Sequence, residues 1–165
     1  ISPIDLNDAK LPEMLLGKIK HHGVDSSKLV LEVTESCAID NALQLETLNR
    51  LRIKGMIIAL DDFGTGYTNI HQLKNLPVNK IKIDRSLIFN IAEDRLAQVI
   101  VHSLLDIFEE LDVNVIAEGI EQPADLDYMN NLPIPLLLQG YIVSKPKAIG
   151  EICRWHHSWK KTVLA

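Results

Sequence analysis

Short apolar runs alternate with longer segments of helical periodicity along this chain. Five of the apolar runs are short and several are rich in Val and Ile, which is typical of strands buried on both faces of a parallel sheet. We therefore predict strands at Leu29–Thr34, Met56–Leu60, Lys80–Ile83, Asn114–Ala117 and Leu136–Ile142.

The segments between these runs carry apolar residues at helical spacing, as helices with one buried face do. Helices are predicted at Leu11–Lys20, Ala42–Ile53, Leu96–Leu111, Pro123–Asn131 and Gly150–Lys161. In the last of these, Trp155 and Trp159 lie one turn apart and are expected to pack in the core. The regular alternation of strand and helix predicts an α/β fold with a parallel sheet. An open doubly wound sheet and a (β/α)8 barrel both fit this rhythm.

Polar side chains gather near the carboxyl ends of the predicted strands. They are Glu32 and Glu35 at the first strand, Asp61 and Asp62 at the second, Lys82 and Asp84 at the third, Glu118 and Glu121 after the fourth, and Gln139 within the fifth. Functional groups at this end of consecutive strands are typical of (β/α)8 barrels. The pattern therefore favours a barrel over an open sheet.

Acids from several strands that point to one rim repel one another, and divalent cations are the simplest compensation. Mg²⁺ and Mn²⁺ prefer carboxylate oxygen as a ligand. Single residues also have simpler interpretations: Glu121 could complement the dipole of the helix that begins at Pro123, and Asp61 and Asp62 could belong to a turn. The recurrence on five consecutive strands favours a functional site.

Composition narrows the possible functions. The 165 residues are 47% hydrophobic and 24% charged, as in a single globular domain with one core. The formal net charge is −5, so a basic face for a nucleic-acid polymer is not expected. No apolar run approaches the roughly 20 residues of a membrane-spanning helix. Cys37 and Cys153 have no metal-like spacing, which predicts a cytoplasmic location, although the parent protein could be membrane-anchored.

In this order and spacing, the motifs resemble those of the EAL-domain phosphodiesterases, from Ile1 to Pro146. The most specific motif is Asp61-Asp62-Phe63-Gly64-Thr65-Gly66-Tyr67, and the others are Leu31-Glu32-Val33-Thr34-Glu35, Lys82-Ile83-Asp84-Arg85, Ala117-Glu118-Gly119-Ile120-Glu121 and Gln139-Gly140-Tyr141. The resemblance implies a TIM-like barrel with one reversed strand. It also implies hydrolysis of cyclic di-GMP to linear pGpG with two Mg²⁺ or Mn²⁺ ions.

The resemblance assigns expected roles to these residues. Glu32 and Asp61 would bind a first metal ion, and Asp61 would bridge to a second ion that Asp62 and Glu118 also bind. Lys82 would hold or activate the attacking water, and whether Lys82 or Glu118 moves the proton is left open. The remaining expected site residues are Glu35 as the anchor of the glycine-rich loop with Thr65 and Gly66, Asp84 and Gln139 lining the site, and Glu121 as a supporting acid.

Two features of the family would precede Ile1, namely the glutamate of the Glu-Ala-Leu motif and an asparagine ligand. A typical barrel has about 250 residues, so roughly 80 more would be needed. We therefore expect residues 1–165 to form a single EAL-type barrel domain that lacks its first strands and Glu-Ala-Leu motif. We expect this chain alone to hydrolyse cyclic di-GMP weakly or not at all.

Other functions compete with this interpretation. The fold could be a catalytically degenerate module that binds cyclic di-GMP or a protein partner. A kinase interpretation of Asp62-Phe63-Gly64 would need an upstream glycine-rich loop and a His-Arg-Asp loop, which the sequence lacks. A dimerisation fragment is a third possibility, with Tyr67–Leu76 and Leu96–Leu111 as the dimer face. The resemblance implies a homodimer, and upstream regulatory domains in the parent protein.

Overall fold

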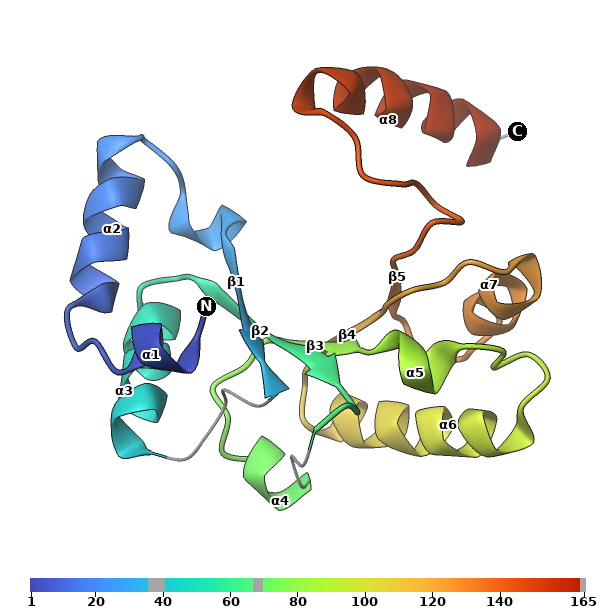
Figure 1. The fold of residues 1–165 in the computed structure, drawn as a ribbon, viewed down its shortest axis with the longest axis horizontal. Helices are drawn as coiled ribbons and strands as arrows, with labels where there is room; N and C mark the ends of the chain where they lie inside the picture. Colours follow the sequence, from blue (N-terminus) through green and yellow to red (C-terminus); the bar gives the residue numbers. More distant parts are fainter. Residues whose placement is uncertain (36–40, 67–69, 164–165) are drawn as a thin grey trace.

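One parallel sheet organises the chain. The computed structural model describes residues 1–35, 41–66 and 70–163, so Cys37 and Tyr67 lie outside the described residues. Five strands pair in the order β1-β2-β3-β4-β5, and every neighbouring pair is parallel (Figure 1). They are β1 Val30–Thr34, β2 Ile57–Phe63, β3 Lys80–Ile83, β4 Asn114–Ala117 and β5 Leu137–Leu138. Consecutive strands that are neighbours in one parallel sheet have the topology of a segment of a (β/α)8 barrel.

Helices connect the strands, so all five strands have their carboxyl ends at one edge of the sheet. The helices are α1 Pro3–Leu6, α2 Leu11–His21, the 3₁₀ helix η1 Ser26–Lys28, α3 Ala42–Ile53, α4 Ile70–Leu73, α5 Arg85–Ile88, α6 Arg95–Glu110, α7 Pro123–Asn130 and α8 Ile149–Val163. Local sequence fixes where several of them begin: Asn41 accepts a hydrogen bond from the Gln44 N–H, and Asp94 accepts from the Leu96 and Ala97 N–H groups. Among these described helices, none has the length and apolar character needed to cross a bilayer.

The second strand is longer than the sequence predicts. It continues through Asp61 and Asp62 to Phe63, and its pairing with β3 is irregular between Leu60 and Phe63. Asp62 has a φ of +57°, which is uncommon for a residue other than glycine. Such a bulge turns side chains away from strict alternation.

The prediction of a fifth strand at Leu136–Ile142 is wrong in length, because regular pairing covers only Leu137–Leu138. Beyond it the backbone bends around Ile120, whose N–H donates to the Gln139 carbonyl and whose carbonyl accepts from the Ile142 N–H. A Cβ on Gly140 would lie 2.0 Å from the Ile120 carbonyl oxygen. This close approach of two backbones replaces the strand, and Gln139 lies just after β5 instead of within it.

The core lies between the sheet and its helices. Helix α6 buries Val101, Leu105 and Phe108, and Phe108 meets Phe63 of β2 in an edge-to-face contact with ring centroids 5.3 Å apart. The expectation that Trp155 and Trp159 pack in this core is wrong. They stack on each other on α8, which stands apart from the other helices in Figure 1, and none of the α8 side chains described, up to residue 159, belongs to the core cluster.

Replacing Phe108 by Ala should lower the free energy of unfolding by about 3–5 kcal/mol, because it removes a fully buried ring and leaves a cavity. Urea denaturation measures this change. The control is Ile53→Ala at the end of α3, where the side chain is 80% exposed and the change should stay within about 1 kcal/mol. Equal losses in the two variants would contradict this placement of the core.

Candidate active site at the carboxyl ends of the strands

A buried lysine contacts three carboxylates at the carboxyl ends of three strands. Lys82 lies on β3 between two fully buried isoleucines and is itself 6% exposed. Its Nζ atom lies 2.9 Å from Glu32 Oε1, 2.7 Å from Asp61 Oδ1 and 2.9 Å from Glu118 Oε1. Glu32 belongs to β1 and Asp61 to β2, and Glu118 directly follows β4. The structure therefore brings these predicted site residues together at one rim.

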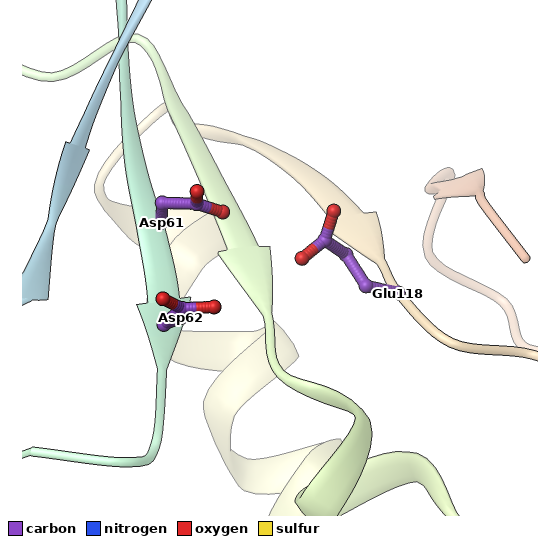
Figure 2. Close-up of side chains that lie close together, drawn as sticks. All are labelled: Asp61, Asp62 and Glu118. Carbon is purple, nitrogen blue, oxygen red and sulfur yellow. The ribbon is translucent and has the colours of Figure 1, made fainter. Parts of the chain in front are cut away.

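A second acid from β2 joins this group. Figure 2 shows Asp61 and Asp62 extending from β2 toward Glu118. One carboxylate oxygen from each of Asp61, Asp62 and Glu118 lies within 4.8 Å of the others. Two consecutive strand residues normally face opposite ways, and the irregularity of β2 with its positive φ at Asp62 allows both to face the site. Three hard oxygen ligands at this separation fit a divalent cation such as Mg²⁺, Mn²⁺ or Ca²⁺.

The charges of the site influence one another strongly. Burial alone would lower the pKa of Lys82, but its hydrogen bonds to Asp61, Glu32 and Glu118 outweigh burial and raise that pKa. Burial raises the pKa of Glu118, although Lys82 partly offsets this effect. The pKa of Asp62 is also raised, first by burial and then by the charge of Asp61. Four carboxylates thus share one ammonium group, and the excess negative charge favours a bound cation.

Glu35 holds the glycine-rich loop that follows β2. Its carboxylate is buried, and Oε2 accepts hydrogen bonds from the Gly64 N–H at 3.0 Å and the Gly66 N–H at 2.8 Å. A Cβ on Gly66 would lie 2.9 Å from this carboxyl carbon, so any side chain there would push the Glu35 carboxylate out of its present position. Thr65 Oγ1 donates to the Asp62 carbonyl at 2.9 Å. The loop is therefore fastened directly beside Asp61 and Asp62.

The remaining predicted residues lie at the border of the site. Asp84 caps α5 by accepting from the Ser86 N–H at 2.9 Å. Burial would raise the pKa of Asp84, but the hydrogen bonds from Ser86 and the Arg85 backbone hold it below its usual value. Glu121 forms an ion pair with Arg85 at 3.0 Å. Arg85, Glu121 and the exposed Gln139 line a pocket of about 500 Å³ that also includes Tyr141.

Arg85 is a residue to which the sequence patterns assigned no role. A signal for it is present, because Arg85 follows Lys82 by three residues just as Glu121 follows Glu118. If Lys82 meets Glu118 across two neighbouring parallel strands, opposite charges three residues further along both segments can also meet.

A parallel α/β sheet with acids at the carboxyl ends of its strands is the arrangement of a TIM-like barrel, and these acids could hold a metal ion. Comparison with known families identifies the protein family. The family model of the EAL domain matches residues 1–146. The chain belongs to the EAL domain family.

Two relatives and one solved structure illustrate the similarity. MucR of Pseudomonas aeruginosa, a bifunctional diguanylate cyclase/cyclic di-GMP phosphodiesterase, is 34% identical over 92% of this chain and 22% of its own length. NbdA of the same organism, a cyclic di-GMP phosphodiesterase, is 34% identical over 90% of this chain and 19% of its own length. The MucR phosphodiesterase structure in complex with c-di-GMP superimposes with a TM-score of 0.83 at 33% identity, over 92% of this chain and 62% of that one.

A structure with a cation is also similar. The Klebsiella pneumoniae BlrP1 complex with calcium and cyclic di-GMP matches with a TM-score of 0.81 at 30% identity, over 88% of this chain and 37% of that one. The expectations of an EAL domain and of a TIM-like α/β fold are confirmed. The chain spans about a fifth of the length of the curated relatives it matches.

Replacing Lys82 by Met should destabilise the fold at neutral pH, because Glu32, Asp61 and Glu118 would face one another without their shared counter-charge. We expect the free energy of unfolding to fall by about 2–3 kcal/mol, at the low end for a buried ion pair because Glu32 is half-exposed. Burial raises the pKa of Glu118, and protonation of Glu118 removes part of the repulsion that Lys82 would otherwise offset. The loss should therefore shrink as pH falls, and millimolar Mn²⁺ should also reduce it.

The matched control is Lys80→Met, which removes a lysine two residues earlier on β3. Urea denaturation of both variants at neutral and acidic pH separates the two effects. A loss for Lys82→Met that is independent of both pH and Mn²⁺ would contradict the electrostatic role of Lys82.

Proposed function

We propose that this chain forms the main part of a two-metal phosphodiesterase site that hydrolyses cyclic di-GMP to linear pGpG in bacterial second-messenger signalling. The observation that carries the proposal is the convergence of Asp61, Asp62 and Glu118 within 4.8 Å, beside a buried lysine. Similarity to MucR, a bifunctional diguanylate cyclase/cyclic di-GMP phosphodiesterase, and to NbdA, a cyclic di-GMP phosphodiesterase, supports the substrate and the reaction.

The donor set suggests how two ions would be held. Glu32 and Asp61 would bind one ion, and Asp61 would bridge to a second ion held by Asp62 and Glu118. All of these ligands are carboxylates, and we propose Mg²⁺ or Mn²⁺ as the ions. When bound, such a pair supplies positive charge at the phosphate and lowers the pKa of a coordinated water.

The protein side chains would contribute charge and position. Lys82 donates to three carboxylates as an ammonium group, so we propose that it stabilises negative charge that develops on the phosphate. Glu35 fastens the glycine-rich loop next to the acids through two backbone N–H groups, and this fixes Asp62 relative to Asp61. The pocket lined by Arg85, Gln139 and Tyr141 offers cationic, amide and aromatic groups beside the rim for the rest of the dinucleotide.

We further propose that residues 1–165 belong to a single EAL-type barrel domain completed by strands and a Glu-Ala-Leu motif outside the chain. The 62% coverage of the MucR phosphodiesterase chain supports this. The much greater length of the curated relatives supports additional regulatory domains in the parent protein. The free thiol of Cys153 supports a cytoplasmic location for this part of the protein.

The chain alone should show little hydrolysis of cyclic di-GMP with Mn²⁺, whereas a longer protein that includes its native upstream segment should be active. The physical reason is that the family's glutamate and asparagine ligands would come from that segment. Chromatographic detection of pGpG from both proteins at several Mn²⁺ concentrations measures this. Ordinary turnover by the chain alone would contradict the expectation.

A substitution in the longer protein tests the residues themselves. Asp62→Asn should lower the rate by at least about a hundredfold, because it removes a metal-ligand charge. The control is Asp106→Asn, on the exposed part of α6, which should leave the rate unchanged. Tight binding of cyclic di-GMP with no hydrolysis by the unmodified longer protein would support the alternative, a catalytically degenerate binding module.

A homodimer is also proposed, on the basis of an exposed apolar stripe. Leu96, Val99 and Ile100 share one face of α6 and are 68%, 47% and 38% exposed. Exposed apolar residues grouped in this way favour an interface.

Leu96→Glu should shift the chain toward monomer and raise the dimer dissociation constant at least about tenfold, because it places a charge in the proposed interface. Light scattering and sedimentation, with and without Mg²⁺ and dinucleotide, measure the change. The control is Ile53→Glu at the end of α3, where the side chain is 80% exposed. An unmodified chain that is monomeric under all these conditions would refute the proposed dimer.

A further inference from the structure

A second ion pair connects the same two segments that carry Lys82 and Glu118. Arg85 Nη2 lies 3.0 Å from Glu121 Oε2. Arg85 begins α5, one residue after the end of β3, and Glu121 lies in the loop between β4 and α7. The contacts Lys82–Glu118 and Arg85–Glu121 therefore join the ends of β3 and β4 twice, three residues apart.

The side chain of Arg85 packs against the backbone of Gly119. Gly119 has a φ of +70°, and a Cβ there would lie 2.5 Å from the Cβ and 2.6 Å from the Cγ of Arg85. The aliphatic part of Arg85 thus lies directly against the backbone next to Glu118. The absence of a side chain at position 119 is what permits the approach.

The opposite side of the same turn is also held. The Ile120 N–H donates to the Gln139 carbonyl at 3.1 Å, and the Ile120 carbonyl accepts from the Ile142 N–H at 3.2 Å. The Glu118 N–H donates to the Ile83 carbonyl at 3.1 Å. The turn from Glu118 to Glu121 is therefore fixed by backbone bonds on two sides, and the ion pair fixes its far end.

The ordinary interpretation of Arg85–Glu121 is a surface salt bridge. The two side chains are 48% and 33% exposed, and such pairs contribute at most about 1 kcal/mol to stability. The effect of the pair on the position of Glu118 can be larger than its effect on stability, because a metal ligand must be held within about 0.5 Å of its productive place. A contact that contributes little to unfolding free energy can therefore still determine how well Glu118 binds an ion.

We propose that Arg85 and Glu121 are positioning residues for the metal site. Their ion pair, in which Arg85 packs against Gly119, holds Glu118 at the distance from Asp61 and Asp62 that is needed to bind an ion. The proposal rests on the metal site of the proposed function. Glu121 acts through Arg85: its Oε2 atom accepts from the guanidinium, and among the described residues the acids that gather within 4.8 Å are Asp61, Asp62 and Glu118.

The test compares Mn²⁺ binding, measured by electron paramagnetic resonance, in the unmodified chain and in four variants. Arg85→Met keeps the aliphatic stem over Gly119, and Glu121→Gln keeps the shape of the side chain. Each should weaken Mn²⁺ binding about tenfold, as loss of a residue that orients a metal ligand does. Arg85→Lys should lose less. The charge-exchanged double variant, Arg85→Glu with Glu121→Arg, should regain much of the binding.

Two further measurements distinguish the possible outcomes. Urea denaturation should show only small changes in all variants, and amide hydrogen exchange without metal should show faster exchange at Glu118 and Ile120 in the single variants, with recovery in the double variant. Unchanged Mn²⁺ affinity and unchanged exchange in the single variants would overturn the proposal, as would a double variant as weak as the single ones. If the unmodified chain binds no Mn²⁺, the metal site falls, and the exchange pattern alone decides whether the pair positions Glu118.

Discussion

The contact of one buried ammonium group with three carboxylates is the constraint on which this rim of the sheet depends. Glu32, Asp61 and Glu118 come from three segments that a parallel sheet brings to the same edge, and their mutual repulsion would push those segments apart. Lys82 offsets the repulsion from within the sheet, where its neighbours Ile81 and Ile83 hold it in place. Lys82 thus stabilises the fold at this rim. One ammonium group does not balance four acids with Asp62 included, so the rim still attracts cations.

An irregularity in β2 brings more carboxylate groups to the site than a regular strand could. In a regular strand without a bulge, Asp61 and Asp62 would face opposite sides of the sheet. The irregular pairing after Leu60 and the positive φ of Asp62 bring both to Glu118, and residues held in such conformations cluster at functional sites. Glu35 stabilises the loop that follows by accepting from two glycine N–H groups. The backbone conformation and the ligand set are therefore parts of one arrangement.

Sequence patterns predict the elements whose information is local. Strands β3 and β4 have the predicted bounds, and Glu32, Asp61, Asp62 and Glu118 lie near one rim. The failures have a common physical cause, since they depend on contacts between distant segments. The fifth strand is shortened where Gly140 meets Ile120, and the pairing of Arg85 with Glu121 depends on their close approach across neighbouring strands. Hydrophobic periodicity carries no information about such approaches.

Among the three acids that contact Lys82, the one on the edge strand is the most exposed. The side chain of Glu118 after β4 is 16% exposed and that of Asp61 on β2 is 20% exposed, whereas that of Glu32 on the edge strand β1 is 49% exposed. Water screens charges most strongly where exposure is greatest, so Glu32 contributes least to the field that would hold an ion. Any segment that pairs with the β1 edge would desolvate Glu32 and strengthen its interaction with Lys82 and with a cation. The proposed dependence of hydrolysis on an upstream segment thus has two sources: additional ligands, and a less polarisable surrounding for a ligand already present.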